Sequence, residues 1–126
     1  MAHPITAVQA AKLQDTVGDS ATVTLGFTDG SVATIHYITT GSPRFAKERV
    51  EVFVAGRVLQ LDNFRRLHGY SWPGFTRMKL RRQDKGQRAC AQAFLRAVKG
   101  EAPAAIPADE LFEVARVTIR AAAQLR

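Results

Sequence analysis

Cationic side chains are the most concentrated chemical feature of this sequence. It carries 18 Lys and Arg against 11 Asp and Glu, and most of the cations lie between residues 44 and 99, most densely from Arg77 to Arg88. Such a concentration suits a phosphate backbone, a nucleotide or an acidic protein, and it equally suits a face that meets only water. Charge alone leaves the partner open.

Two of these cations, Arg44 and Lys47, occur in a Gly- and Pro-containing segment, residues 39–47, that interrupts the alternating pattern of its neighbours. Such a segment is predicted to be a loop, and binding residues are often found on loops. A loop whose cations contact only solvent is the competing interpretation.

Familiar motifs for catalysis and metal binding are absent from the sequence. It contains no G-x-G-x-x-G, no G-x-x-x-x-G-K-S/T and no H-E-x-x-H, and its three histidines lie far apart. We therefore assign no catalytic residue and no metal ligand. The single cysteine, Cys90, falls in the apolar stripe of a predicted helix, which favours a core position over a reactive thiol.

Aromatic residues interleave with cations between residues 65 and 79. Tyr70, Trp72 and Phe75 could stack nucleic-acid bases beside arginines that bind phosphates. Because no recognisable RNA-binding signature accompanies them, we favour a hairpin whose aromatics pack on the sheet while its arginines stay solvated.

Alternating apolar residues predict the strands that position these side chains. The predicted strands are residues 5–13, 21–28, 31–38, 49–54, 57–61, 66–70 and 75–82. Asp29-Gly30 has the residue types of a type I′ turn, so we expect a two-residue hairpin in which Leu25 faces Thr34. Three apolar side chains of the second strand then lie on the face opposite Leu25, namely Ala33, Ile35 and Tyr37.

Apolar residues spaced by three and four predict two C-terminal helices. The first begins at Asp84, which forms a capping-box-like pair with Gln87, and it ends at Gly100. Asp109 is predicted to cap the second helix. Its apolar side comprises Leu111, Phe112, Ala115, Ile119 and Ala122.

The predicted fold class is α+β, with residues 1–126 as a single domain. We expect a mostly antiparallel sheet of about six or seven strands, with the two C-terminal helices packed on one face. The other face stays open for oligomerisation, with Ala33, Ile35 and Tyr37 as candidate contacts, because exposed apolar patches of this kind usually meet another protein surface.

The composition is that of an ordinary globular chain, with 46% hydrophobic residues. No apolar run approaches the roughly 20 residues that a membrane span needs, and the first residues do not form a signal peptide. One cysteine excludes an internal disulfide. We expect a cytoplasmic protein with no membrane partner.

The order of several short motifs resembles the C-terminal domain of the Gfo/Idh/MocA oxidoreductases. The likeness is greatest to the form fused behind a zinc-type alcohol dehydrogenase-like region in bacterial bi-domain oxidoreductases, and it runs over nearly the whole chain. The segments that carry it are VTLGFTDGSV at residues 23–32, KERVEVF at 47–53, RQDKG at 82–86, FLRAVKG at 94–100 and IP at 106–107.

The resemblance implies that an N-terminal Rossmann domain binds NAD or NADP in complete relatives. It also implies that the C-terminal domain closes the substrate cleft and forms the subunit interface. No position here matches the family's Glu-Lys-Pro lysine or its Asp-x-x-x-His pair. The resemblance therefore implies that the Rossmann domain is absent, that the isolated chain is inactive and binds no cofactor, and that its partners are the missing Rossmann domain of the same polypeptide and a second copy.

Four residues are candidates for lining that cleft: Arg44 and Lys47 in the loop, and Asp84 and Lys85 at the expected helix start. A helix start presents free backbone N–H groups and partial positive charge, which suit a cofactor phosphate or an anionic substrate. For Asp84, a plain helix cap is the competing interpretation.

We therefore expect the substrate-cleft and oligomerisation domain of an NAD(P)-dependent oxidoreductase. The alternative is a free-standing basic binding module for nucleic acid or an acidic protein, with nucleic acid the less favoured partner.

Overall fold

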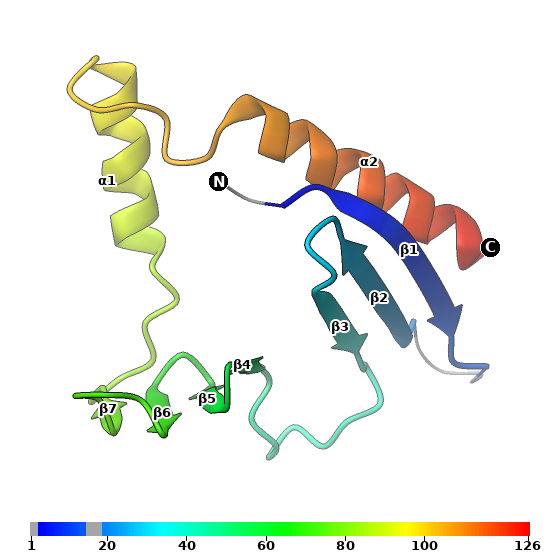
Figure 1. Cartoon of the computed structure of the whole chain (residues 1–126), viewed down its shortest axis with the longest axis horizontal. Helices are drawn as coiled ribbons and strands as arrows, with labels where there is room; N and C mark the ends of the chain where they lie inside the picture. Colours follow the sequence, from blue (N-terminus) through cyan, green and yellow to red (C-terminus); the bar gives the residue numbers. More distant parts are fainter. Residues whose placement is uncertain (1–2, 15–18) are drawn as a thin grey trace. The chain divides into compact units, whose positions relative to one another are not determined.

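The computed structural model describes residues 3–14 and 19–126, which contain seven strands followed by two helices (Figure 1). The α+β class and the seven antiparallel strands are confirmed. The elements in chain order are β1 (Ile5–Lys12), β2 (Ala21–Phe27), β3 (Val32–Tyr37), β4 (Arg49–Val54), β5 (Arg57–Asp62), β6 (Arg66–Tyr70), β7 (Arg77–Lys79), α1 (Gln87–Val98) and α2 (Ala108–Gln124).

The strands form two sheets, ordered β1-β2-β3 and β4-β5-β6-β7, where we expected one. The break falls at residues 38–48, the Gly- and Pro-containing segment, which forms no strand. The chain accordingly divides into two compact units. Unit 1 comprises residues 1–41 and 104–126, and unit 2 comprises residues 42–103. The assignment of residues 1–126 to a single domain stays a prediction.

Unit 1 has its core between the three-stranded sheet and α2, which lies along β1 (Figure 1). Val8 faces Leu25 across the β1–β2 ladder, and both are buried together with Ala121 of α2. Val117 packs against the same cluster. Small side chains on α2 allow the helix to approach the strand closely.

Side chains of α2 also bind the backbone of β1, which is an edge strand and therefore has backbone groups that no strand satisfies. The Gln124 side chain accepts a hydrogen bond from the Ala10 N–H at 2.7 Å and donates one to the Val8 carbonyl at 3.0 Å. Glu113 Oε1 accepts from the Ile5 N–H at 2.8 Å. The helix thus takes the place of a further strand along β1.

The orientation of α2 differs from our prediction. Val117 and Ala121 face the sheet, whereas the side chains expected there are exposed: Leu111 by 53%, Phe112 by 65% and Ile119 by 69%. The predicted cap is also wrong, because the N-cap residue is Pro107. Asp109 lies inside the first turn, where its charge complements the helix dipole.

The β2–β3 hairpin has a three-residue loop, Thr28 to Gly30, so the predicted two-residue type I′ turn is wrong. The Phe27 N–H donates to the Ser31 carbonyl, and the Gly30 N–H donates to the Phe27 carbonyl, both at 3.0 Å. Gly30 has φ +83°, but Asp29 is not among the residues with positive φ. A turn followed by one left-handed glycine is the usual three-residue hairpin.

This loop shifts the register by one residue, so Leu25 faces Ala33 and Val23 faces Ile35. A one-residue shift moves every side chain to the other face of a sheet. Ala33, Ile35 and Tyr37 therefore lie on the same face as Leu25, not on the opposite face as predicted. Ile35 and Tyr37 remain 52% and 64% exposed, since α2 covers the β1 side of that face.

The four-stranded sheet of unit 2 has one polar and one apolar face. Its register places the apolar side chains together, namely Val50, Val52, Val54, Leu59, Leu61, Leu67 and Met78. Phe75 packs against Gly69 so closely that a Cβ there would lie 2.7 Å from Phe75 Cδ1. The Trp72 indole N–H donates to the Val58 carbonyl at 2.9 Å. These two aromatics pack on the sheet, as the favoured interpretation predicted.

Helix α1 begins after Gly86, which has φ +77°, and no side chain caps it. Asp84 Oδ1 instead accepts from the Gly86 N–H at 2.8 Å, so the predicted capping box is wrong. Gly100 ends the helix with φ +73°, as predicted. No residue of α1 is buried, and Cys90 is exposed rather than in a core.

Candidate anion-binding pocket

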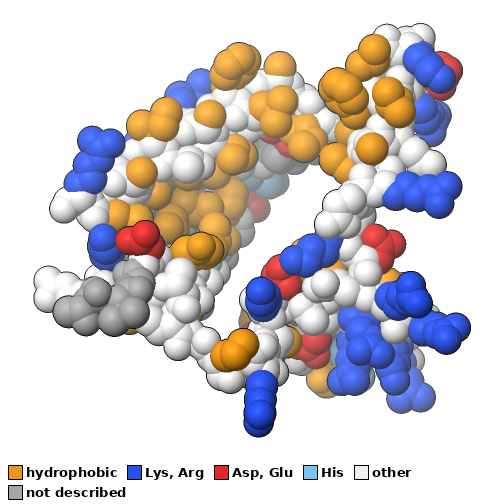
Figure 2. Space-filling model, turned by 180° about the vertical axis from the view of Figure 1, so that it is seen from behind, with side chains coloured by type: hydrophobic (Ala, Val, Ile, Leu, Met, Phe, Trp, Pro, Cys, Tyr) orange, Lys and Arg blue, Asp and Glu red, His pale blue; other side chains and the backbone are white. Residues whose placement is uncertain are grey.

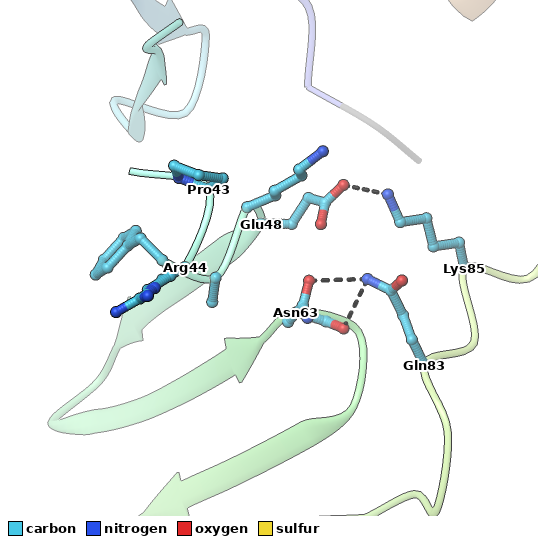
Figure 3. A pocket seen from close by; sticks show the side chains of 9 residues that line it. Pro43, Arg44, Glu48, Asn63, Gln83 and Lys85 are labelled. Atoms are coloured by element: carbon cyan, nitrogen blue, oxygen red, sulfur yellow. Dashed lines mark hydrogen bonds and ion pairs between the residues drawn. The ribbon is translucent and has the colours of Figure 1, made fainter. Parts of the chain in front are cut away.

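A pocket of about 530 Å³ lies within unit 2 where three segments meet. Residues 43–48 supply one wall, Asn63 of the β5–β6 turn supplies the floor, and the segment leading to α1 supplies Gln83 and Lys85 (Figure 3). Loops rather than regular elements therefore carry most of its lining.

An ion pair closes one side of the pocket. Lys85 Nζ contacts Glu48 Oε1, and Figure 3 shows the two side chains pointing toward one another. The Asn63 N–H also donates to the Glu48 carbonyl at 2.7 Å, which fixes the backbone of Glu48 at the start of β4. The second carboxylate oxygen, Glu48 Oε2, is buried without a hydrogen-bond partner.

An amide contact fixes the segment before α1. Gln83 Nε2 donates to the Asn63 carbonyl at 3.1 Å and to Asn63 Oδ1 at 2.8 Å, as drawn in Figure 3. The Asp84 N–H donates to the Phe64 carbonyl at 3.1 Å. The pocket floor is consequently tied to a tight turn, in which Asn63 has φ +51° and Phe64 has φ +48°.

Positive φ at both central residues is the signature of a type I′ turn. Asparagine tolerates this conformation, but a bulky aromatic rarely adopts it, so Phe64 is held there by its surroundings. The strained turn places the Asn63 carbonyl where Gln83 binds it.

Two cations of the pocket have no acidic counterpart. Among the ion pairs of residues 3–14 and 19–126, none involves Arg44 or Lys47. Figure 3 shows the Arg44 side chain extending away from Lys85. The lining thus has an excess of positive charge, which suits a small anion.

Three of the four predicted cleft residues, Arg44, Lys47 and Lys85, therefore come together in this pocket. Asp84 does not. Asp84 instead lines a separate, mostly apolar cavity of about 110 Å³, whose lining includes Leu61, Leu67, Met78 and Leu80.

Glu48, Asn63 and Gln83 also line the pocket, but the sequence did not single them out. Glu48 and Lys85 are 37 residues apart, and nothing in either segment specifies the other as its partner. The Asn63 side chain gave a usable signal, since asparagine is common in turns with positive φ.

The described part of the chain contains no candidate metal-binding cluster. Residues 3–14 and 19–126 contain no group of three or more His, Cys, Asp or Glu side chains placed to hold a metal ion. The helices described here also include none that is both long and apolar enough to cross a membrane.

The fold and the pocket define an α+β protein with a cationic, loop-lined cavity. Comparisons with models of protein families, with curated proteins and with solved structures give no match to this chain. The resemblance to the Gfo/Idh/MocA C-terminal domain accordingly stays a prediction.

Proposed function

We propose that this chain is the substrate-cleft and oligomerisation domain of an NAD(P)-dependent oxidoreductase. It works with a dinucleotide-binding domain and is inactive alone. The observation that carries this proposal is the pocket, in which Arg44, Lys47 and Lys85 converge from segments 37 or more residues apart along the chain.

The pocket supports a binding role rather than a catalytic one. Lys85 is paired with Glu48, and Gln83 is paired with Asn63, so these side chains are positioned but already engaged. Arg44 and Lys47, which no acid pairs with in the described residues, can attract an anionic group. An anionic substrate is oriented by such a set, while the hydride comes from a cofactor held elsewhere.

Two further parts of the proposal rest on other features. The exposed apolar side chains of β3 support self-association, with a second copy as the partner. We also propose a cytoplasmic setting, which the single cysteine in the sequence supports because secreted domains often carry disulfides.

The binding role is tested by titrating the isotopically labelled chain with inorganic phosphate and with glycolate, a small hydroxylated anion. We expect saturable amide shifts confined to residues 43–48 and 83–85. Lys47→Ala should weaken them several-fold, because it removes an unpaired cation. Arg96→Ala, which removes an exposed cation on α1, is the matched control and should leave them unchanged. Shifts spread over all cationic segments would contradict a specific pocket.

The oxidoreductase assignment is tested separately. Calorimetric titration of the isolated chain with NADH and NADPH should give no measurable affinity, because the glycine turn that cradles the pyrophosphate is absent from the sequence. The chain joined to the dinucleotide-binding domain encoded beside it should oxidise NAD(P)H with anionic carbonyl substrates, and Lys47→Ala should raise KM for these alone. Micromolar NADH binding by the isolated chain, or no such neighbouring domain, would overturn the assignment.

A further inference from the structure

The polar face of the unit 2 sheet places four basic side chains in two cross-strand pairs. Arg66 of β6 lies directly opposite Lys79 of β7, and His68 lies opposite Arg77. Residues opposite each other in an antiparallel ladder point to the same side, with Cβ atoms about 5 Å apart, so the like charges of Arg66 and Lys79 destabilise the sheet. Such an arrangement calls for an anionic counterpart.

The chain itself does not supply that counterpart. Asp62 faces Arg66 in the ladder, but its carboxylate contacts Arg49 at 3.9 Å, and Glu51 contacts Arg49 at 2.8 Å. The carboxylates of this face thus pair with Arg49 of β4 and not with the cations of β6 and β7. Within residues 3–14 and 19–126, no ion pair includes Arg66, Arg77 or Lys79. Figure 2 shows Lys and Arg side chains gathered over the part of unit 2 that holds β6 and β7.

Exposed aromatic side chains lie on the same face as these cations. Phe53, Val58 and Tyr70 form one row across β4, β5 and β6. Phe53 is 71% exposed and Tyr70 is 52% exposed, so their rings are open to solvent. The His68 ring stacks against Tyr70 with centroids 6.3 Å apart and extends the aromatic surface toward the basic pairs.

We propose that this cationic face, made of Phe53, Arg66, His68, Tyr70, Arg77 and Lys79, binds single-stranded nucleic acid. Arg66, Arg77 and Lys79 neutralise phosphates, while Tyr70 and Phe53 stack bases. This site lies on side chains other than those that line the pocket of Arg44, Lys47 and Lys85, and it is independent of the oxidoreductase proposal.

The aromatics decide between possible polyanions. An acidic protein surface offers carboxylates to the cations but few flat groups to stack on Tyr70 and Phe53, whereas unpaired bases stack on aromatic rings with any sequence. A duplex offers phosphates but keeps its bases stacked on each other, so it too would leave the rings unused. The sequence favours packed aromatics here, and Trp72 and Phe75 do pack; the register leaves Tyr70 exposed.

The test measures fluorescence anisotropy of labelled oligo(dT) and oligo(rU) with the chain over a series of salt concentrations. We expect binding that persists at physiological salt, with an affinity that falls linearly in logarithmic coordinates. Arg77→Gln should weaken binding and reduce the salt slope by about 1. Tyr70→Ala should weaken binding about tenfold or more and leave the slope unchanged, because it removes stacking and no charge.

Arg96→Gln, which removes an exposed cation on α1, should change neither affinity nor slope. Tighter binding of one oligonucleotide would assign the site to DNA or to RNA, and either supports the proposal. Absence of binding at physiological salt, equal affinity for polyglutamate, stronger binding of duplex DNA, or full affinity in Tyr70→Ala would each overturn it.

Discussion

Asp29 shows how a single side chain decides the path of a hairpin. Its Oδ1 accepts hydrogen bonds from the Ser31 hydroxyl at 2.6 Å and from the Ser31 N–H at 3.0 Å. Such local bonds favour a turn in which Asp29 itself keeps negative φ and only Gly30 is left-handed. The three-residue loop, and with it the β2–β3 register, follows from this contact.

The same contact lowers the pKa of Asp29 below its ordinary value. The Ser31 hydroxyl is the largest cause, the Ser31 N–H is the next, and the nearby His3 ring contributes further. A carboxyl whose pKa is lowered by folding stabilises the fold at pH above its unfolded pKa, and this contribution is lost as pH falls through the lowered value. The hairpin should therefore lose this contribution in acid, as pH falls from the ordinary pKa of aspartate through the lowered pKa of Asp29.

We predict that Ser31→Ala raises the pKa of Asp29 part of the way to its ordinary value, because the backbone N–H of residue 31 remains as a donor. Ser31→Thr keeps the hydroxyl and should preserve the lowered pKa. Carboxyl carbon chemical shifts followed through an acid titration measure both variants. An unchanged pKa in Ser31→Ala would show that the hydroxyl does not donate to Asp29 in solution.

At the scale of elements, the contact between α2 and β1 combines few apolar side chains with hydrogen bonds to an edge strand. Val8, Leu25 and Ala121 are the buried apolar residues of the described chain. Because this core is small, hydrogen bonds from β1 to the Gln124 and Glu113 side chains provide a large share of the interaction that holds α2 against β1.

We predict that Gln124→Ala lowers the free energy of unfolding by about 1 kcal/mol, the usual net value of such hydrogen bonds where water can replace them in part. The Ala10 amide, which donates to Gln124 Oε1, should exchange its proton faster in this variant. Urea unfolding and amide hydrogen exchange are the measurements.

Gln92→Ala is the matched control, since Gln92 is an exposed glutamine on α1. It should change neither the unfolding midpoint nor the exchange of Ala10. Equal effects of the two substitutions would mean that the bonds from Gln124 contribute nothing in solution.

For the whole molecule, the dominant feature is the amount of apolar surface that the described chain leaves uncovered. Ile35 and Tyr37 on β3, Phe94, Leu95 and Val98 on α1, and Leu111, Phe112 and Ile119 on α2 are all more than half exposed. Monomeric proteins rarely expose so many large apolar side chains. Burial yields roughly 25 cal/mol per Å² of apolar surface, so covering these side chains with a partner would stabilise an assembly.

We predict that the chain self-associates at micromolar concentration, with β3 in the contact. A stable dimer needs about 800 Å² buried on each partner, and a two-fold arrangement lets identical faces meet. Ile35→Asp should weaken association, because the charge would be buried against apolar groups. Sedimentation measures the oligomer, and circular dichroism checks the fold.

Thr34→Asp places the same charge on the opposite face of the same strand and should leave association unchanged. A chain that stays monomeric at every concentration, or equal weakening by both substitutions, would show that the face bearing Ile35 does not bind a second copy. The dinucleotide-binding domain would then be the partner to test for that face.

The sequence by itself determined the secondary structure but little of how the strands and helices pair and pack. Period-two alternation located all seven strands, because a side chain's alternation depends only on the local backbone. Gly100 ended α1 for the same local reason. The residues of the pocket loop were also visible, since Arg44 and Lys47 stand beside Gly41 and Pro43.

Only the tertiary structure decided register, faces and partners. Type I′ turns occur at Ala55-Gly56 and Asn63-Phe64, while Asp29-Gly30, with the strongest signal, lies in a three-residue loop in which only Gly30 has positive φ. The additional loop residue shifts the β2–β3 register, so that Ile35 lies on the same face as Leu25. Likewise α2 presents Ala121 rather than its larger apolar residues to the sheet. The hairpin loop follows from the contact between Asp29 and Ser31, whereas the face that α2 packs depends on its contacts with strands distant in sequence, which local pattern and propensity do not encode.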